Sequence, residues 1–281
     1  MGSLHFFLFY YVATALRYLF IAGPAFLIFY IFYRSRFAQF RIQKLFPKKQ
    51  DYYRELIFSF LTFVIFSLIG VIVTNPSVLP HTKIYTDVSE YGWGYFGLSI
   101  LLALLIHDTY FYWTHRLMHH PWLFRAFHLT HHRSTNPSPW AAFAFSPLEA
   151  VVEGSITFVI VFLIPIHTAA FLAFLIIMTV FNVMGHLGYE IFPAWLVQSP
   201  VGKWLNTSTN HNMHHKFFRG NYGLYFRFWD ELLRTTHPQY DKTLQALVTP
   251  STGNESVIAN STSLTSPSAR KNTTEPQPAT P

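Results

Sequence analysis

Three short stretches of the chain concentrate histidine at spacings that suit metal binding. On a helix, residues at i, i+3 and i+4 share one face, with side chains about 5–6 Å apart. Each stretch therefore predicts a patch of imidazoles that point the same way, and eight imidazoles from three patches suit two metal ions with several ligands each. The stretches are His115-Arg116-Leu117-Met118-His119, His128-Leu129-Thr130-His131-His132 and His211-Asn212-Met213-His214-His215.

The composition restricts what these histidines could bind. The chain has 15 histidines and no cysteine, which excludes disulfides, thiolate zinc sites, iron–sulfur clusters and cysteine-ligated haem. Imidazole accepts iron, zinc, copper or nickel, so the ligand type alone does not select the metal.

The elements that must position the histidines are predicted to lie in a membrane. Of the 281 residues, 51% are hydrophobic and only 12% are charged, whereas soluble domains carry about 25% charged residues. A bilayer core of about 30 Å needs about 20 helical residues. Three apolar segments reach that length, the first interrupted by Arg17, and two shorter ones around Pro165-Ile166-His167 predict a tight hairpin that crosses the bilayer fully or only dips into it. The five segments are roughly 8–33, 56–74, 91–113, 150–166 and 169–185.

The basic residues predict which way the chain crosses. The loop after the first segment holds seven basic residues, and the loop near Pro80 to Glu90 has only Lys83, balanced by Asp87 and Glu90. The positive-inside rule places the first loop in the cytoplasm, and counting segments brings every histidine stretch to the same side. Membrane orientation therefore explains the net charge of +7 better than nucleic-acid binding does. The seven residues are Arg34, Arg36, Arg41, Lys44, Lys48, Lys49 and Arg54.

These patterns predict an all-α fold: a multi-pass transmembrane helical bundle with a cytoplasmic helical cap that carries a histidine-rich dinuclear metal site. We divide the chain into N-terminal spanning segments with a basic loop (1–90), a catalytic domain (91–242) and a tail (243–281). From about Thr249 the tail is rich in Ser, Thr, Asn and Pro, which predicts disorder because such a segment cannot bury enough apolar surface to offset ordering.

The motifs resemble those of the sterol desaturase and fatty acid hydroxylase superfamily of membrane di-iron oxygenases. HDTYFYWTHRLMHH at 107–120, FHLTHHRS at 127–134 and NHNMHHKFFRGNYGLYFRFWD at 210–230 are similar to its three histidine boxes. SPWAAFAFSPLEA at 138–150 and IPIH at 164–167 look most like the C-5 sterol desaturases, although Ser146 stands where that branch would carry a histidine.

The resemblance adds one ligand and implies the metal. The family places a histidine after the hairpin, which is His186 here; the upstream position that is histidine in some members is Asn182. The implied ligands are His115, His119, His128, His131, His132, His186, His211, His214 and His215. His107, His120, His167 and His237 are weaker candidates, since a lone interfacial histidine is usually structural.

Carboxylates near the boxes could fix imidazole tautomers, as metal sites commonly require. Asp108 lies seven residues before His115, nearly on the same helical face, and Glu190 and Asp230 have similar potential. Each could equally be a helix cap or an ordinary interfacial charge.

The implied activity is O2-dependent hydroxylation or desaturation of a sterol or fatty acyl C–H bond at two iron ions, although zinc fits the same ligands in isolated protein. The sequence carries no electron-transfer module, so a separate cytochrome b5- or ferredoxin-type protein should supply electrons at the basic face. The membrane would be the endoplasmic reticulum of a eukaryote or the inner membrane of a bacterium. The alternatives are a membrane zinc hydrolase, for which no H-E-x-x-H occurs, and a metal-binding or transport protein, whose ionisable residues would lie nearer the midplane.

Overall fold

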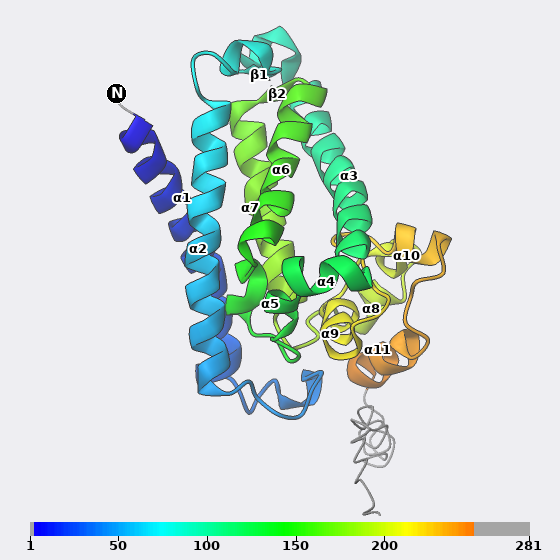
Figure 1. The fold of residues 1–281 in the computed structure, drawn as a ribbon. Helices are drawn as coiled ribbons and strands as arrows, with labels where there is room; N and C mark the ends of the chain where they lie inside the picture. Colours follow the sequence, from blue (N-terminus) through cyan, green and yellow to red (C-terminus); the bar gives the residue numbers. More distant parts are fainter. Residues whose placement is uncertain (1–2, 250–281) are drawn as a thin grey trace, which may run out of the picture. The chain divides into compact units, whose positions relative to one another are not determined.

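A computed structural model describes residues 3–249, and these form an almost entirely helical protein. Five long helices run side by side along the bundle, and the short helices gather at one of its ends (Figure 1). The long helices are α1 (Ser3–Phe26), α2 (Lys49–Val73), α3 (Gly92–Met118), α6 (Pro147–Leu163) and α7 (Thr168–Gly185). The short ones are α4 (Pro121–Phe127), α5 (Leu129–His132), α8 (Ala194–Val197), α9 (Ser208–Phe217), α10 (Phe228–Leu232) and α11 (Tyr240–Val248).

Four helical segments are long and apolar enough to cross a membrane: Ser3–Phe32, Lys49–Val73, Gly92–Met118 and Thr168–Gly185. The first combines α1 with a π-helical turn, Leu27–Phe32, and it runs without a break through Arg17. A charged side chain ends an apolar run in the sequence, but it leaves the backbone hydrogen bonds of the helix intact. The multi-pass all-α prediction is confirmed, with α6, at 17 residues, slightly short as expected.

The outward faces of the long helices are apolar. Large hydrophobic side chains stay exposed along them, among them Leu8, Phe20, Leu61, Leu101 and Leu172. Exposed apolar surface of this extent does not occur on soluble monomers and fits contact with lipid.

The end of the bundle without histidine boxes is closed by two short parallel strands. β1 (Ile84–Tyr85) pairs with β2 (Ile166–His167), and the Lys83 amide donates to the Val161 carbonyl at 2.7 Å. The turn between α6 and α7 therefore reaches the same end of the bundle as the connection from α2 to α3. The hairpin runs the full length of the bundle. Its second arm, α7, is long and apolar enough to cross a membrane, and full crossing by α6 stays a prediction. The 3-10 turns Leu79–His81 and Val88–Glu90 flank β1.

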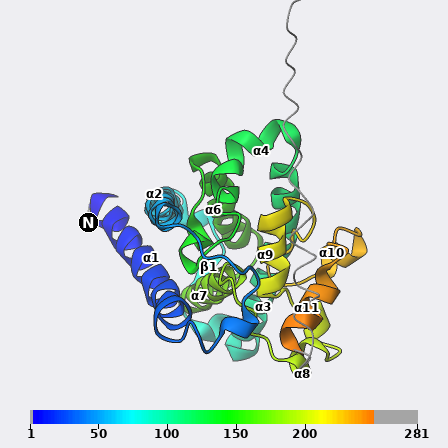
Figure 2. The same ribbon diagram turned by 90° about the horizontal axis from the view of Figure 1, so that it is seen from below.

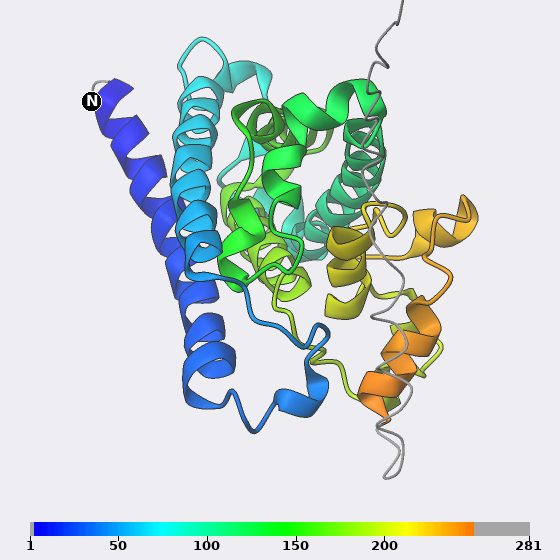
Figure 3. The ribbon, with the colours of Figure 1, turned by 60° about the horizontal axis from the view of Figure 1, so that its bottom comes forward.

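The basic loop lies at the other end, against the histidine-bearing elements, and contains the 3-10 turn Ala38–Phe40. Gln43 donates through Nε2 to the Thr135 carbonyl and to Asn212 Oδ1, each at 2.9 Å. The Ile42 amide donates to the Gly188 carbonyl at 3.1 Å. Viewed toward this end, the loop crosses beside α7, α9 and α11 (Figures 2 and 3). The expectation that this loop and every box share one end of the bundle is therefore met.

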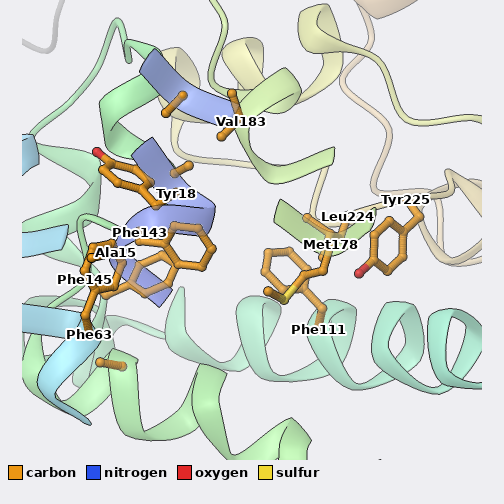
Figure 4. Packing of buried hydrophobic residues seen from close by; sticks show 13 residues of the cluster. Ala15, Tyr18, Phe63, Phe111, Phe143, Phe145, Met178, Val183, Leu224 and Tyr225 are labelled. Carbon is orange, nitrogen blue, oxygen red and sulfur yellow. The ribbon is translucent and has the colours of Figure 1, made fainter. Parts of the chain in front are cut away.

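An aromatic core joins the N-terminal helices to the rest of the bundle. Tyr18 of α1, Phe63 of α2 and Phe143 of the 3-10 turn Pro139–Phe143 pack edge to face, as Figure 4 shows. The Tyr18 hydroxyl donates to the Trp140 carbonyl at 2.8 Å. The cluster continues to Phe111, Leu224 and Tyr225, so the packing reaches the walls of the histidine site.

The predicted tail boundary at 243 is too early. Residues 243–248 belong to α11, and Leu244 is buried together with Met213 of α9 and Val197 of α8. The part of the tail predicted to be disordered beyond Thr249 lies outside the described residues.

Candidate metal centre

The structure brings all nine candidate histidines together at the boundary between the long helices and the short ones. Their nitrogens form two groups, and within each group the ligand atoms lie within 4.8 Å of one another. Eight of the nine side chains are buried, and His119 alone is partly exposed. The five-histidine group contains His115, His119, His128, His132 and His214, and the four-histidine group contains His131, His186, His211 and His215.

Each H-x2-H-H box divides between the two groups according to helical phase. In the second box His128 and His132 join the five-histidine group, while His131 joins the other. In the third box the division is reversed, with His211 and His215 in the four-histidine group and His214 in the five-histidine group. Residues four apart on a helix are separated by about 40° around its axis, but neighbours are separated by about 100°. The spacing therefore lets one short helix face two metal positions.

Within each group the Nε2 atoms converge. The Nε2 atoms of His115 and His128 lie 2.9 Å apart, and those of His119 and His132 lie 3.1 and 3.0 Å from His214 Nε2. In the other group, His131, His211 and His215 lie 3.1–3.2 Å from His186 Nε2. With metal–nitrogen bonds of about 2.1 Å, two ligands at 90° would be about 3.0 Å apart and tetrahedral ligands about 3.4 Å. The observed separations fit nitrogens that share a metal ion.

A shared metal ion explains the His115–His128 contact when each Nδ1 carries the proton. His115 Nδ1 lies 2.9 Å from the Tyr222 carbonyl, which only accepts, and His128 Nδ1 lies 2.6 Å from Glu149 Oε1. A neutral imidazole has one N–H, so protonation of both Nδ1 atoms leaves two Nε2 lone pairs that face each other. Burial lowers the pKa of His128 well below its ordinary value, which disfavours a second proton. Two lone pairs in this arrangement suit a metal ion between them.

Two more imidazoles are oriented by backbone carbonyls. His186 Nδ1 lies 2.7 Å from the Asn182 carbonyl, and His214 Nδ1 lies 2.7 Å from the Gly220 carbonyl. Donation from Nδ1 leaves each Nε2 free to bind metal, as metal-ligating histidines require. Burial also lowers the pKa of His186 to about 4, so it is neutral at physiological pH.

The turn after α9 supplies two of these carbonyls. Phe218 and Asn221 adopt left-handed backbone conformations, with φ of 63° and 57°, and they aim the carbonyls of Gly220 and Tyr222 at the histidines. At Gly220, with φ of 73°, a Cβ would lie 2.4 Å from the Thr235 carbonyl oxygen, so only glycine fits. Asn221 fixes the turn by donating to the Asn210 carbonyl at 3.0 Å and accepting from the His237 amide at 2.7 Å.

The three predicted carboxylates bind backbone amides near the histidines and not the imidazoles themselves. Asp108 accepts from the amides of Tyr225 and Phe226 at 2.8 and 3.2 Å, and Asp230 accepts from those of Tyr222 and Gly223 at 2.9 and 2.8 Å. Both stabilise the loop whose Tyr222 carbonyl orients His115. Within residues 3–249, neither carboxylate forms a hydrogen bond to a histidine, and both accept from backbone amides of the loop instead.

Glu190 holds the first turn of α9. Its Oε2 accepts from the Thr209 amide at 3.0 Å and from the Thr209 hydroxyl at 2.6 Å. This contact fixes the start of the helix that carries His211, His214 and His215. Glu190 was predicted to contact an imidazole, but in the structure it fixes the helix that carries the third box.

Glu149 is the carboxylate that does contact an imidazole, and it is absent from the predicted site residues. It lies in the first turn of α6 and is buried, as is its partner His128. The segment SPLEA at 146–150 belongs to a family motif, but nothing in its sequence indicates a contact between Glu149 and a histidine.

The weaker histidine candidates lie outside both groups. His107 contacts the Tyr225 hydroxyl at 2.8 Å, and His237 stacks on Phe217. His167 caps α7 at the opposite end of the bundle, and His120 precedes α4 on the exposed surface.

A small pocket adjoins the four-histidine group. It lies between α7 and the segment from Asn206 to Leu224, and His211 forms part of its wall. Phe181, Met184 and Leu224 supply apolar walls, and the cavity has room for about one water-sized group beside His211.

Comparison with known proteins agrees with this site. Residues 100–235, which contain all nine histidines, match the family model described as fatty acid hydroxylase. The chain is 30% identical over 202 residues to a Delta(7)-sterol 5(6)-desaturase of Gibberella zeae, covering 71% of this chain and 61% of that protein. It is 28% identical over 186 residues to the lathosterol oxidase of Homo sapiens, covering 66% of this chain and 60% of that protein.

The chain thus spans about three fifths of the length of these relatives. No solved structure matches it. The matched region encloses all the histidine boxes: through residues 100–235, the chain is similar to the fatty acid hydroxylase family.

Proposed function

We propose that the protein is an O2-dependent membrane oxidoreductase that hydroxylates or desaturates a C–H bond of a lipid at a dinuclear iron centre. The observation that carries the proposal is the convergence of nine imidazoles into two groups at one end of an apolar helical bundle. Nitrogen ligands without thiolate suit iron, and the two groups provide one position for each of two ions.

The chain's own residues hold and orient this centre. The nine histidines would bind the ions through Nε2, while the carbonyls of Tyr222, Asn182 and Gly220 and the Glu149 carboxylate hold the Nδ1 protons. Bound iron would supply O2 activation and one-electron chemistry. Burial of the histidines keeps bulk water away from this chemistry.

The electron balance requires a partner. Hydroxylation converts C–H, O2, two electrons and two protons into C–OH and one water. Desaturation converts two adjacent C–H groups with the same O2, electrons and protons into a C=C bond and two waters. A separate donor of the cytochrome b5 or ferredoxin type would supply the electrons. The basic loop and the exposed Arg116, Arg125 and Arg219 near the boxes suit an acidic donor surface.

A sterol is the substrate class that the relatives favour, with a fatty acyl lipid as the broader possibility. The relatives are named as sterol desaturases and lathosterol oxidase. The apolar, outward-facing side chains of the long helices suit a substrate that arrives from the bilayer.

Metal analysis combined with O2 consumption tests the proposal. Protein purified from iron-supplied cells should contain two iron ions per chain and consume O2 in the presence of reductant and a sterol. Lipid profiles of cells with and without the gene should differ in one sterol or acyl species. Protein that binds only zinc and consumes no O2 after iron reconstitution would contradict the proposal and favour the hydrolase alternative.

We also propose that the centre faces the cytoplasm, because the seven basic residues of the first loop lie at the same end of the bundle. The native chain has no cysteine, so single cysteines can report sidedness. Cysteines at the exposed positions Thr135 and Ala246 should react from the cytoplasmic side, and one at exposed Ser89 from the other side. Labelling of Thr135→Cys from the side that labels Ser89→Cys would reject this orientation.

A further inference from the structure

Glu149 stands apart from every other group that contacts the nine histidines. Its Oε1 lies 2.6 Å from His128 Nδ1, and the two side chains are 1% and 2% exposed. The other Nδ1 hydrogen bonds of the site, from His115, His186 and His214, go to backbone carbonyls. Among the described residues, His128 is therefore the histidine of the site whose imidazole is bound by a carboxylate.

The contact matters because it fixes which nitrogen of His128 faces the metal position. A histidine that ligates a metal commonly donates its other N–H to a carboxylate or a carbonyl, which sets its tautomer and the orientation of its ring. Glu149 is separated from the five-histidine position by one imidazole ring, so its loss should act on that position more strongly than on the other.

The surrounding structure fixes Glu149 in place. Ser146 caps α6, with its hydroxyl 3.2 Å from the Glu149 amide, and the same hydroxyl donates to the Phe127 carbonyl at 2.6 Å. Phe127 directly precedes His128. The start of α6 therefore contacts the second box at two adjacent residues. Ser146 binds the Phe127 carbonyl, and Glu149 binds the His128 imidazole.

Glu149 Oε2 is buried and has no hydrogen-bond partner within residues 3–249, so the contact with His128 is the main polar interaction that explains why an acid stands at this position.

We propose that Glu149 is a positioning residue for the five-histidine group. Its contact with His128 Nδ1 fixes the orientation of the imidazole and directs Nε2 at the metal, so this one of the two metal positions depends on Glu149. The inference rests on the proposed dinuclear centre and adds an asymmetry between its two halves.

Three variants of the full chain separate charge from geometry. Glu149→Ala removes both, whereas Glu149→Gln keeps an oxygen that accepts the Nδ1–H and removes only the charge. Glu153→Gln is the matched control, because Glu153 is a buried acid one turn later on α6 and makes no hydrogen bond to an imidazole in the described chain. The measurement is Fe²⁺ binding to purified, metal-free protein in detergent, read as stoichiometry and affinity.

Wild-type protein and Glu153→Gln should bind two Fe²⁺ with the same affinities. In Glu149→Ala one of the two ions should bind about 10–100-fold more weakly, the range found when an outer partner of a ligating histidine is lost. Glu149→Gln should fall between them. A general loss of structure would weaken both ions together, so selective loss of one ion identifies the positioning role.

The outcomes also distinguish this inference from the proposed function. Wild-type protein that binds no iron would reject the dinuclear centre itself. Two ions bound with wild-type affinity in Glu149→Ala would leave the centre standing and overturn the role of Glu149. If Glu149→Ala does not accumulate in membranes, Glu149→Asp decides, because its shorter side chain withdraws the carboxyl from His128 Nδ1. Unchanged affinity for both ions in that variant would reject the positioning role.

Discussion

The two histidine groups differ in how firmly the protein holds them. In the five-histidine group, His115, His128 and His214 have their Nδ1 protons bound by two carbonyls and a carboxylate. Nδ1 of His132, in the same group, has no partner among the described residues. In the four-histidine group only His186 has such a partner, and Nδ1 of His131 and of His215 has none within residues 3–249. More of the imidazoles are therefore oriented in the five-histidine group than in the other.

The surroundings of the groups also differ. The four-histidine group adjoins the small pocket through His211, and all four of its ligands are buried. The five-histidine group contains His119, the one partly exposed ligand.

Removal of one ligand from either group should have the largest effect. His214→Ala and His131→Ala should each lower turnover by more than about 100-fold, beyond the loss that an outer partner causes. Each variant should keep one iron, held by the undamaged group. Turnover and iron content of membrane-inserted protein check this, with His120→Ala, which lies outside both groups, as the control. Near-normal turnover in both variants would remove the case for the site.

Chelation should separate the two groups by rate. A chelator added to protein with two irons should extract them in two phases, the first about 10–100-fold faster, given the size of outer-partner effects. The fast phase belongs to the four-histidine group, because it has fewer ligands and fewer Nδ1 partners. His131→Ala protein, which lacks one of its ligands, should show only the slow phase. A single phase in wild-type protein would show that the groups are equivalent.

The sequence could predict the ligands but not what orients them. The i, i+3, i+4 spacing and the family resemblance led to the nine histidines that the structure places in two groups. Glu149 was hidden because Ser146-x-x-Glu149 has the spacing of an ordinary helix capping box. Ser146 does cap α6, but the Glu149 side chain turns to His128 instead of back to the cap, and that choice depends on tertiary contact.

The same limit applies to the backbone carbonyls and to α11. Left-handed conformations at Phe218 and Asn221 aim the carbonyls of Gly220 and Tyr222, and nothing in a phenylalanine signals such a conformation. The segment that forms α11 has few large apolar residues, among them Leu244 and Leu247, and a polar tail follows it. Its composition therefore predicted that it belongs to the tail. Leu244 packs against Met213 of α9, and this tertiary contact stabilises a helix that is too short to predict from the sequence.

A methyl group added at the pocket should have a moderate effect confined to the four-histidine side. The Cβ of Gly185→Ala would lie 3.4 Å from His211, in the wall of the pocket. We expect both irons to be retained and turnover to fall several-fold, because the added methyl group contacts the ligand His211. Gly97→Ala on α3, where a Cβ would meet no atom within 4 Å, is the control. Equal turnover in the two variants would show that close packing against His211 does not matter for activity.

Truncation after Thr249 should have the smallest effect on either group. All nine ligands and their Nδ1 partners lie before that residue, and the composition of the remainder offers no apolar surface to pack. Iron content and turnover should stay within about two-fold, less than any loss expected from an outer partner of a ligand.

Truncation after Gln239 provides the contrast, because it removes α11 and with it the buried Leu244 that packs on Met213 of α9. Since α9 carries ligands of both groups, this shorter chain should lose both irons together, unlike the single-ligand variants. If the cut after Thr249 also releases both irons, the tail supports α9 and the boundary of the catalytic unit lies beyond the helix.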